Sequence, residues 1–147
     1  MLMILCLLTL FSCGHNSIKE SITFIADEQS TMRQDIPTDS IKGAYLSLDA
    51  NRYDFGTIRS KETSEIVIEF EVENLGKIPL VIFKADVSCG CMSVDYPKVP
   101  VFPNKREKLR VTIDTKGQIG IFNKPVFIKS NAENDVVLIR ILGEIEK

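Results

Sequence analysis

The stretch Glu65-Ile66-Val67-Ile68-Glu69-Phe70-Glu71-Val72-Glu73 decides the fold class of this chain. Apolar side chains occupy its even-numbered positions, and acidic side chains alternate with them from Glu69 onward. Because successive side chains of a β-strand point to opposite faces of a sheet, a period of two predicts one buried face and one polar face. The stretch is therefore predicted to be a half-buried β-strand.

The same alternation recurs further along the chain. It is present in residues 108–113, 126–128 and 139–145, and runs rich in Gly, Asn and Pro separate these segments. No segment of about ten or more residues carries a helical apolar stripe. About seven or eight short strands within residues 44–147 have the size and rhythm of an immunoglobulin-like β-sandwich, so we predict an all-β domain of that kind. Turns or strand bends are assigned to Gly56, Asn74, Gly76, Gly120, Asn131 and Gly143.

Charge patterning predicts one strand pair. The acids Glu69, Glu71 and Glu73 lie on the outward face of their strand, and Lys108 and Arg110 lie on the outward face of another. In an immunoglobulin-like topology these two strands are neighbours in one sheet. We therefore expect the acids to face the bases across the strand pair, with an unpaired solvated face as the alternative.

The N-terminus has the features expected of an export signal. Residues 1–12 are free of charged side chains and end in Leu10-Phe11-Ser12, directly before Cys13. A helix of that length rises about 18 Å, which is too short for the ~30 Å hydrocarbon core of a bilayer. We expect residues 1–12 to be a lipoprotein signal peptide and Cys13 to carry the lipid that anchors the chain to a membrane. The alternative is an ordinary secretory signal with an incidental Cys13.

Residues 13–43 are expected to be a flexible tether that begins at the lipidated cysteine. They are mostly polar and show no sustained apolar period. A flexible chain of this length has a root-mean-square span of about 30 Å, which would hold the folded domain clear of the lipid headgroups. Because Gly14 and not Asp follows the cysteine, the outer membrane is favoured over the inner membrane. We therefore expect an exported, membrane-anchored protein.

Composition excludes one class of partner. The net charge is −2 and acids and bases are interspersed, so nothing provides the positive field that phosphate backbones require. The chain has no Trp and few other aromatic residues, which argues against a stacking platform for bases or sugars. No nucleic acid partner is expected.

The motif Ser88-Cys89-Gly90-Cys91-Met92 is the most chemically distinctive part of the expected domain. In an extended strand the Cα atoms of the two cysteines would lie about 6.6 Å apart, at the upper edge of the range for a disulfide. Gly90 supplies the backbone freedom that would bring the sulfur atoms closer. A disulfide in so small a loop is expected to be easily reduced, which makes Cys89 and Cys91 a candidate redox pair.

Three other interpretations of this motif stay open. Two thiolates and the thioether of Met92 suit a soft ion such as Cu(I), whereas zinc would need Asp86, Asp95 or the remote His15 to complete four ligands. A nucleophilic cysteine would need a base, and His15, the only histidine, lies in the tether. The last interpretation is structural: two small buried thiols, or a structural disulfide, at a strand-to-loop corner.

Read together, several runs of the chain resemble one family. They are Asp54-Phe55-Gly56-Thr57-Ile58, Asn74-Leu75-Gly76-Lys77-Ile78-Pro79-Leu80-Val81-Ile82, Ser88-Cys89-Gly90-Cys91, Gly120-Ile121-Phe122-Asn123-Lys124, Ser130-Asn131 and Ile139-Arg140-Ile141-Leu142-Gly143. Their order and spacing are similar to the bacterial domain-of-unknown-function family 1573. The resemblance extends from Asp54 to the last residue. The chain departs from the family pattern at Met92, where Thr is common, and at Asn104, where Gly is common.

The resemblance implies a small exported protein or lipoprotein with an immunoglobulin-like, chaperone-type sandwich and no established activity. Together with the residues, it favours a non-enzymatic interaction or assembly module that reaches an unknown protein partner from its tether. The alternative is a redox or Cu(I)-handling envelope protein that works through Cys89 and Cys91. No cofactor is expected under the first hypothesis, and Cu(I) is expected under the second. A hydrolase is not expected, because the domain lacks a histidine and a nucleophile motif.

Overall fold

A computed structural model of the chain describes residues 38–147. The expectations for the signal peptide, Cys13, His15 and most of the tether concern residues outside this range. A 3₁₀ turn, η1 (Thr38–Ser40), precedes the first strand. Eight strands follow it in chain order: β1 (Leu46–Leu48), β2 (Arg52–Arg59), β3 (Glu65–Asn74), β4 (Ile82–Val87), β5 (Met92–Asp95), β6 (Arg106–Asp114), β7 (Gly120–Ser130) and β8 (Val136–Glu146).

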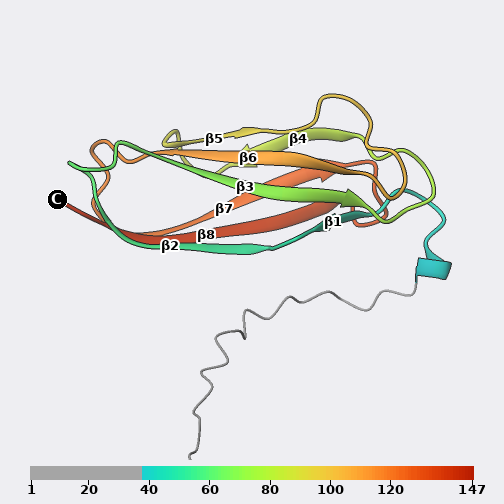
Figure 1. The fold of residues 1–147 in the computed structure, drawn as a ribbon, viewed down its shortest axis with the longest axis horizontal. Coiled ribbons are helices and arrows are strands. Elements are labelled where there is room, and N and C mark those ends of the chain that lie inside the picture. The colour runs from blue at the N-terminus through green and yellow to red at the C-terminus, as the bar shows by residue number, and fades with distance from the viewer. Residues whose placement is uncertain (1–37) are drawn as a thin grey trace, which may run out of the picture. The chain divides into compact units, whose positions relative to one another are not determined.

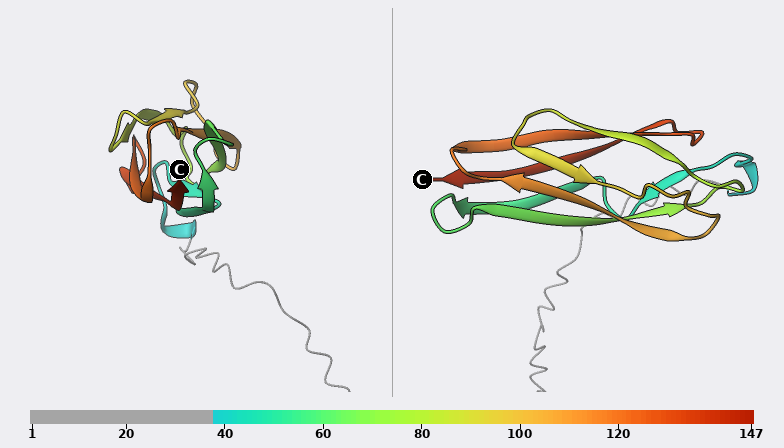
Figure 2. Two further views of the ribbon diagram at one scale, coloured as in Figure 1. Left: turned by 90° about the vertical axis from the view of Figure 1, so that its left-hand side faces the viewer. Right: turned by 90° about the horizontal axis from the view of Figure 1, so that it is seen from above.

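The strands form two four-stranded sheets that pack face to face. Their orders are β1-β3-β6-β5 and β2-β8-β7-β4, and Figures 1 and 2 show the two layers from three sides. All neighbouring strands are antiparallel except β2 and β8, which are parallel. The predicted all-β sandwich is confirmed, at the upper end of the expected strand number.

The core lies between the sheets and is built from the alternating positions that the sequence marked. On β3 the side chains of Ile68, Phe70 and Val72 are at most 3% exposed, while the acids between them point to solvent. The opposing sheet contributes inward side chains from β7 and β8 that are almost fully buried, namely Val126, Ile128, Ile139, Ile141 and Ile145. Burial of these apolar groups from both sheets is the main force that holds the layers together.

The predicted charge pairing between β3 and β6 is also confirmed. Glu69 is opposite Arg110 in the register, and its carboxylate lies 2.7 Å from both Lys108 Nζ and Arg110 Nη2. Hydrogen bonds and charge from these two bases lower the pKa of Glu69 to about 2. Glu71 and Glu73 both pair with Arg106, a base that the sequence analysis did not include.

The structure places the last residues of the expected tether against the sandwich. Ile41 is 2% exposed, and the backbone N–H groups of Lys42 and Gly43 donate to the Glu133 carboxylate. These two donors lower the pKa of Glu133. A single apolar residue carries no period, so nothing in the sequence marked Ile41 as part of the core. The folded region therefore begins by Ile41 and not at residue 44.

Two of the glycines predicted at strand bends, Gly56 and Gly143, shape the β2–β8 strand pair. Gly56 has a φ of 71° and lies where the register between the two strands shifts, as expected of a β-bulge. Gly143 has a φ of 155°, and a Cβ there would collide with the ring of Phe55. The ring of Phe55 packs 5.6 Å from that of the core residue Phe122, so the two glycines allow the bulge and the close approach of this ring.

Candidate functional site

The Cys-Gly-Cys motif lies where the chain crosses from one sheet to the other. Residues 88–91 connect β4, at one edge of the β2-β8-β7-β4 sheet, to β5, at one edge of the other sheet. Cys89 and Cys91 are joined by a disulfide with a Cα–Cα distance of 5.3 Å, shorter than the ~6.6 Å of an extended strand. Both cysteines are half-buried against the core, and Gly90 between them is exposed.

Met92 does not share the environment of the cysteines. It is 6% exposed, belongs to the core and is opposite Ile113 in the register. The disulfide leaves neither Cys89 nor Cys91 with a thiolate, so copper binding there requires prior reduction. Among residues 38–147, no group of three His, Cys, Asp or Glu side chains converges in a way that suits a metal ion.

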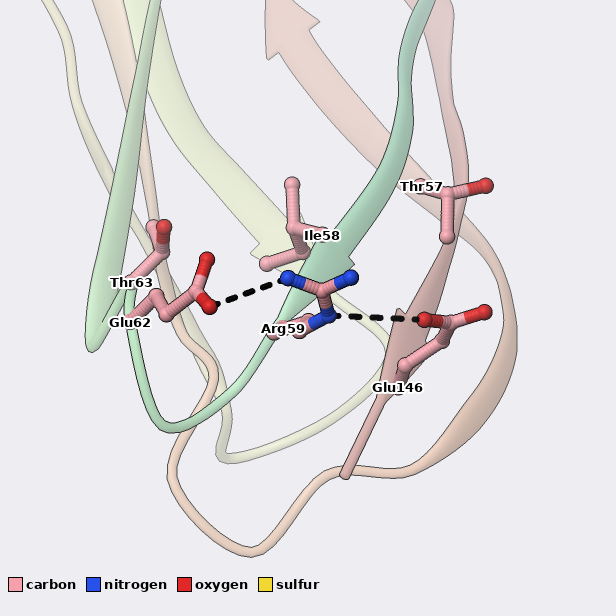
Figure 3. Close-up of a pocket in the computed structure, with 6 residues that line it drawn as sticks. All are labelled: Thr57, Ile58, Arg59, Glu62, Thr63 and Glu146. Atoms are coloured by element: carbon pink, nitrogen blue, oxygen red, sulfur yellow. Dashed lines mark hydrogen bonds and ion pairs between the residues drawn. The ribbon is translucent and has the colours of Figure 1, made fainter.

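A hollow of about 460 Å³ lies near the C-terminal end of β8 (Figure 3). It is lined by Thr57, Ile58, Arg59, Glu62, Thr63 and Glu146. The guanidinium of Arg59 lies 3.0 Å from the Glu62 carboxylate and 3.9 Å from that of Glu146. Because two acids already neutralise this cation, the hollow does not offer a free positive charge to an anionic ligand.

The outer face of the β2-β8-β7-β4 sheet carries apolar side chains that do not enter the core. Phe127 on β7 and Leu138 on β8 are partners in the register, and Val136 is the next outward residue on β8. They are 43%, 39% and 44% exposed, respectively. We call these three residues the β7–β8 patch. Contiguous exposed apolar side chains of this kind mark interaction sites more often than scattered ones do.

Cationic side chains border the β7–β8 patch. Arg52 and Arg140 are opposite each other on β2 and β8, and Lys129 is opposite Val136. Among the described residues, none of these three cations takes part in an ion pair, whereas the nearby Asp86 pairs with Lys84 at 2.6 Å. Against these three cations, Asp135 directly before Val136 is an exposed acid that also forms no ion pair with a described residue, so the unpaired charge of these four residues is positive on balance.

The β7–β8 patch was not predicted from the sequence. A signal for it was present, because Phe127 follows Val126 and Leu138 precedes Ile139, so that apolar side chains stand on both faces of each strand. Alternation alone assigned the buried positions of β7 and β8 correctly. It did not show that the outward residues become neighbours, because that depends on the strand register.

The predicted turn residues Asn74, Gly76 and Asn131 hold the loops in place in different ways, through side-chain hydrogen bonds or through a close backbone approach. Asn74 is fully buried, and its amide accepts from two backbone N–H groups and donates to the carbonyls of Ile78 and Val101. A Cβ on Gly76 would overlap the Gly43 carbonyl oxygen. The side chain of Asn131 bonds Val81 N and Pro79 O. These residues are structural and hold the loops at one end of the sandwich.

Gly120 and Asn104 both have a positive φ. Gly120, predicted as a turn residue, begins β7 with a φ of 97°. Asn104, where the resembled family commonly has Gly, has a φ of 59°, a conformation that Asn adopts more readily than most residues.

Within residues 38–147, no helix is long and apolar enough to span a membrane.

The comparison with protein families identifies this chain. The family described as "Protein of unknown function (DUF1573)" matches residues 46–145, so the chain belongs to that family. A comparison with curated protein sequences gives no match.

Solved structures show the same fold at low sequence identity. A crystal structure of a protein of unknown function from Porphyromonas gingivalis W83 superposes with a TM-score of 0.60 at 16% identity, covering 69% of this chain and 46% of that protein. The ASH/PapD-like domain 7 of human CEP192 gives 0.52 at 12% identity, covering 71% and 88%. WR4, a C. elegans MSP family member, gives 0.52 at 10% identity, covering 68% and 98%. At these identities the likeness shows the sandwich fold alone.

Proposed function

We propose that this member of the DUF1573 family is a lipid-anchored protein of the cell envelope whose sandwich is a non-enzymatic interaction module. The observation that carries this proposal is the β7–β8 patch, in which Phe127, Val136 and Leu138 remain exposed to solvent on a sheet whose inner face already supplies the core. Exposing large apolar side chains to water is unfavourable unless a partner covers them.

The surroundings of the patch indicate the chemistry of the partner. Arg52, Lys129 and Arg140 are without acidic partners among the described residues, so a surface that combines apolar and acidic side chains would match both parts of this face. An apolar centre with a charged rim is the usual arrangement of a protein–protein interface. The partner is therefore a protein surface, and the sandwich is its rigid receptor.

Co-purification from envelope membranes tests the interaction. The tagged full chain is compared with Leu138→Glu and with Val67→Glu, since Val67 is 50% exposed on the outer face of the other sheet. We expect Leu138→Glu to lose the co-purifying protein and Val67→Glu to keep it, with equal thermal stability of both variants. Retention by both variants would contradict the proposal that the β7–β8 patch is the interface.

The lipid anchor has its own test. Cells are supplied with radioactive palmitate, and the full chain is compared with Cys13→Ser. The proposal expects label and membrane sedimentation for the unmodified chain and the loss of both for the variant. Label in neither protein would contradict lipidation at Cys13 and would leave the interaction proposal standing.

A second candidate function rests on the observed disulfide. Cys89 and Cys91 close a loop that contains only Gly90 between them, and Gly90 is exposed. A partner dithiol can reduce this disulfide by exchange: two electrons and two protons pass to Cys89 and Cys91, and the partner becomes a disulfide. The reduced pair, unlike the oxidised one, could then bind Cu(I) as two thiolates, with release of both thiol protons to solvent.

Cysteine replacement separates the two candidates. The double variant Cys89→Ser/Cys91→Ser removes all redox and copper chemistry from the domain but leaves the β7–β8 patch intact. The interaction module predicts that this variant still retains the partner protein, provided that it folds. Loss of function in a folded double variant would favour the redox candidate.

A further inference from the structure

Two loops at one end of the sandwich form a single surface. Residues 75–81 connect β3 to β4, and residues 96–105 connect β5 to β6; we call them the entry-end loops. They pair directly through an antiparallel bridge between Leu80 and Val101, with backbone hydrogen bonds of 2.8 and 2.9 Å. The buried Asn74 side chain also bonds a carbonyl in each loop.

The entry-end loops expose apolar side chains, although other apolar residues of the same loops already supply their contacts with the core. Leu80 and Val101 are at most 2% exposed and take the buried places. Ile78, Val99 and Phe102, in contrast, are 47%, 66% and 62% exposed. Four of the six prolines of the chain lie in these loops, at positions 79, 97, 100 and 103. Proline fixes φ, so the loops present these side chains from a restricted backbone.

The charge of the entry-end loops is of one sign. They contain three lysines, Lys77, Lys98 and Lys105, and no acidic residue. Lys98 Nζ lies 3.1 Å from the centre of the Tyr96 ring, and none of the three lysines forms an ion pair with a described residue. Acidic side chains at this end, such as Glu107 and Glu133, lie outside the two loops. Exposed apolar groups beside unpaired lysines match an anionic lipid surface.

The N-terminal segment enters the sandwich at this same end. Figure 1 shows η1 and the entry-end loops together, opposite the end at which β8 carries the C-terminus. The contact is direct, since Lys77 N donates to Gly43 O at 2.8 Å. A chain anchored at Cys13 would therefore be joined to its anchor on the side where the lysines and the exposed apolar side chains lie.

We propose that the entry-end loops rest on the anionic lipid surface of the membrane that holds the anchor, so that the sandwich stands with its C-terminal end away from the bilayer. This inference deepens the proposed function and rests on its lipid anchor. It replaces the expectation that the tether holds the domain clear of the headgroups, because a root-mean-square span of about 30 Å also includes conformations in which the domain touches the membrane. It also explains how the β7–β8 patch, on the side of the sandwich, stays open to a partner protein while the end is occupied by lipid.

A single-tryptophan experiment tests this contact, because the natural chain has no Trp. Residues 13–147 carrying Phe102→Trp are coupled through the Cys13 thiol to a maleimide lipid in vesicles that contain phosphatidylglycerol and brominated phosphatidylcholine. The coupling makes the test independent of lipidation in the cell. The matched control is Ile119→Trp, because Ile119 is 67% exposed in the loop between β6 and β7, at the other end of the sandwich.

We expect brominated lipid to quench Trp at position 102 at least twofold more than Trp at position 119. Val99→Trp provides a second reporter in the same loop, so that a folding defect of one variant does not decide the result. Equal quenching at positions 102, 99 and 119, or stronger quenching at 119, would overturn the proposal. If the palmitate experiment fails while this contact is seen, lipidation at Cys13 is wrong and the affinity of the loops for lipid stands.

The charge requirement is tested on the same vesicles. In the Phe102→Trp background, the triple variant Lys77→Glu/Lys98→Glu/Lys105→Glu should reduce quenching to the level of the control at position 119. Quenching that is equal in vesicles without phosphatidylglycerol would overturn the assignment to an anionic surface. A concentration-dependent blue shift of Trp at position 102 without vesicles would also overturn it, because the loops would then bind a second copy of the chain.

Discussion

On the outer face of the β1-β3-β6-β5 sheet, acids of β3 meet bases of β6. The outer face of the β2-β8-β7-β4 sheet instead exposes the β7–β8 patch, and the bordering cations Arg52, Lys129 and Arg140 form no ion pair with a described residue. Glu69 is held by two bases at 2.7 Å. Phe127 and Leu138 face solvent between cations that form no ion pair with a described residue. The same sandwich thus has one outer face whose charges pair within the chain and one that leaves neighbouring apolar side chains and cations exposed to solvent.

The difference shows what each face contributes. Opposite charges across a strand pair specify which strands are neighbours and in what register, and they add little stability at an exposed site. Exposed apolar side chains specify nothing within the fold, because the inner positions of β7 and β8 already define the core. The first face therefore serves the folding of the chain, and under the proposed function the second serves its interaction with a partner.

The largest effect is expected when inner and outer positions of β8 are compared. Ile139 is fully buried and the adjacent Leu138 is 39% exposed. Ile139→Ala should lower the free energy of unfolding by about 2–5 kcal/mol, and Leu138→Ala by about 1 kcal/mol or less. Urea denaturation of both variants measures these losses. Similar losses for both would mean that Leu138 is part of the core, which would contradict the description of the β7–β8 patch as an exposed interaction surface.

A smaller effect is expected from the disulfide, which lies between the two sheets and belongs to neither face. Closing a loop of three residues restricts the unfolded chain little, and the chain-entropy relation gives about 1.6 kcal/mol. The variant Cys89→Ser/Cys91→Ser should therefore unfold at a lower urea concentration than the natural chain but less so than Ile139→Ala. A loss larger than that of Ile139→Ala would show that the disulfide, and not the core, holds the sheets together.

The smallest effect is expected from the charged face and depends on pH. The pKa of Glu69 is lowered from 4.5 to about 2 in the folded protein, so its contribution to stability is complete above pH 4.5 and disappears as the pH falls toward 2. The difference in Tm between the natural chain and Glu69→Gln should therefore be small near neutral pH and shrink over this interval. Glu65→Gln, on the same strand but without an ion pair among the described residues, is the control. A difference that grows as the pH falls would contradict the pairing.

Local patterns predicted most of the fold. The alternation in residues 65–73 lies within one strand, so the buried sheet face could be inferred without coordinates. The strand pair could be inferred because residues 69 and 110 carry opposite charges on the outward faces of two strands. The attachment of Ile41 could not, because an isolated apolar residue has no period. The hydrogen bonds of Asn74 reach Tyr45 and Val101, 29 and 27 positions away, and only the folded chain brings these groups together.

The candidate sites were harder to predict for the same physical reason. The spacing of Cys89 and Cys91 lies at the limit of disulfide geometry in an extended strand, so the sequence left their state open and the contraction to 5.3 Å was needed to join them. The β7–β8 patch depends on Phe127 being opposite Leu138, and the entry-end loops meet only through the Leu80–Val101 bridge. Such surfaces depend on pairings between distant segments, and the periodicity within one strand does not predict those pairings.

The most direct test of the contrast between the two outer faces is site-specific photocrosslinking in the cells that produce the protein. A photoreactive amino acid replaces Leu138 in one full-length chain and Val67, on the outer face of β3, in another. The proposed interaction module predicts a crosslinked protein at position 138 that disappears when Phe127→Glu is added, and none at position 67. Crosslinks of equal yield at both positions, or at position 67 alone, would contradict the claim that the β2-β8-β7-β4 sheet carries the interface.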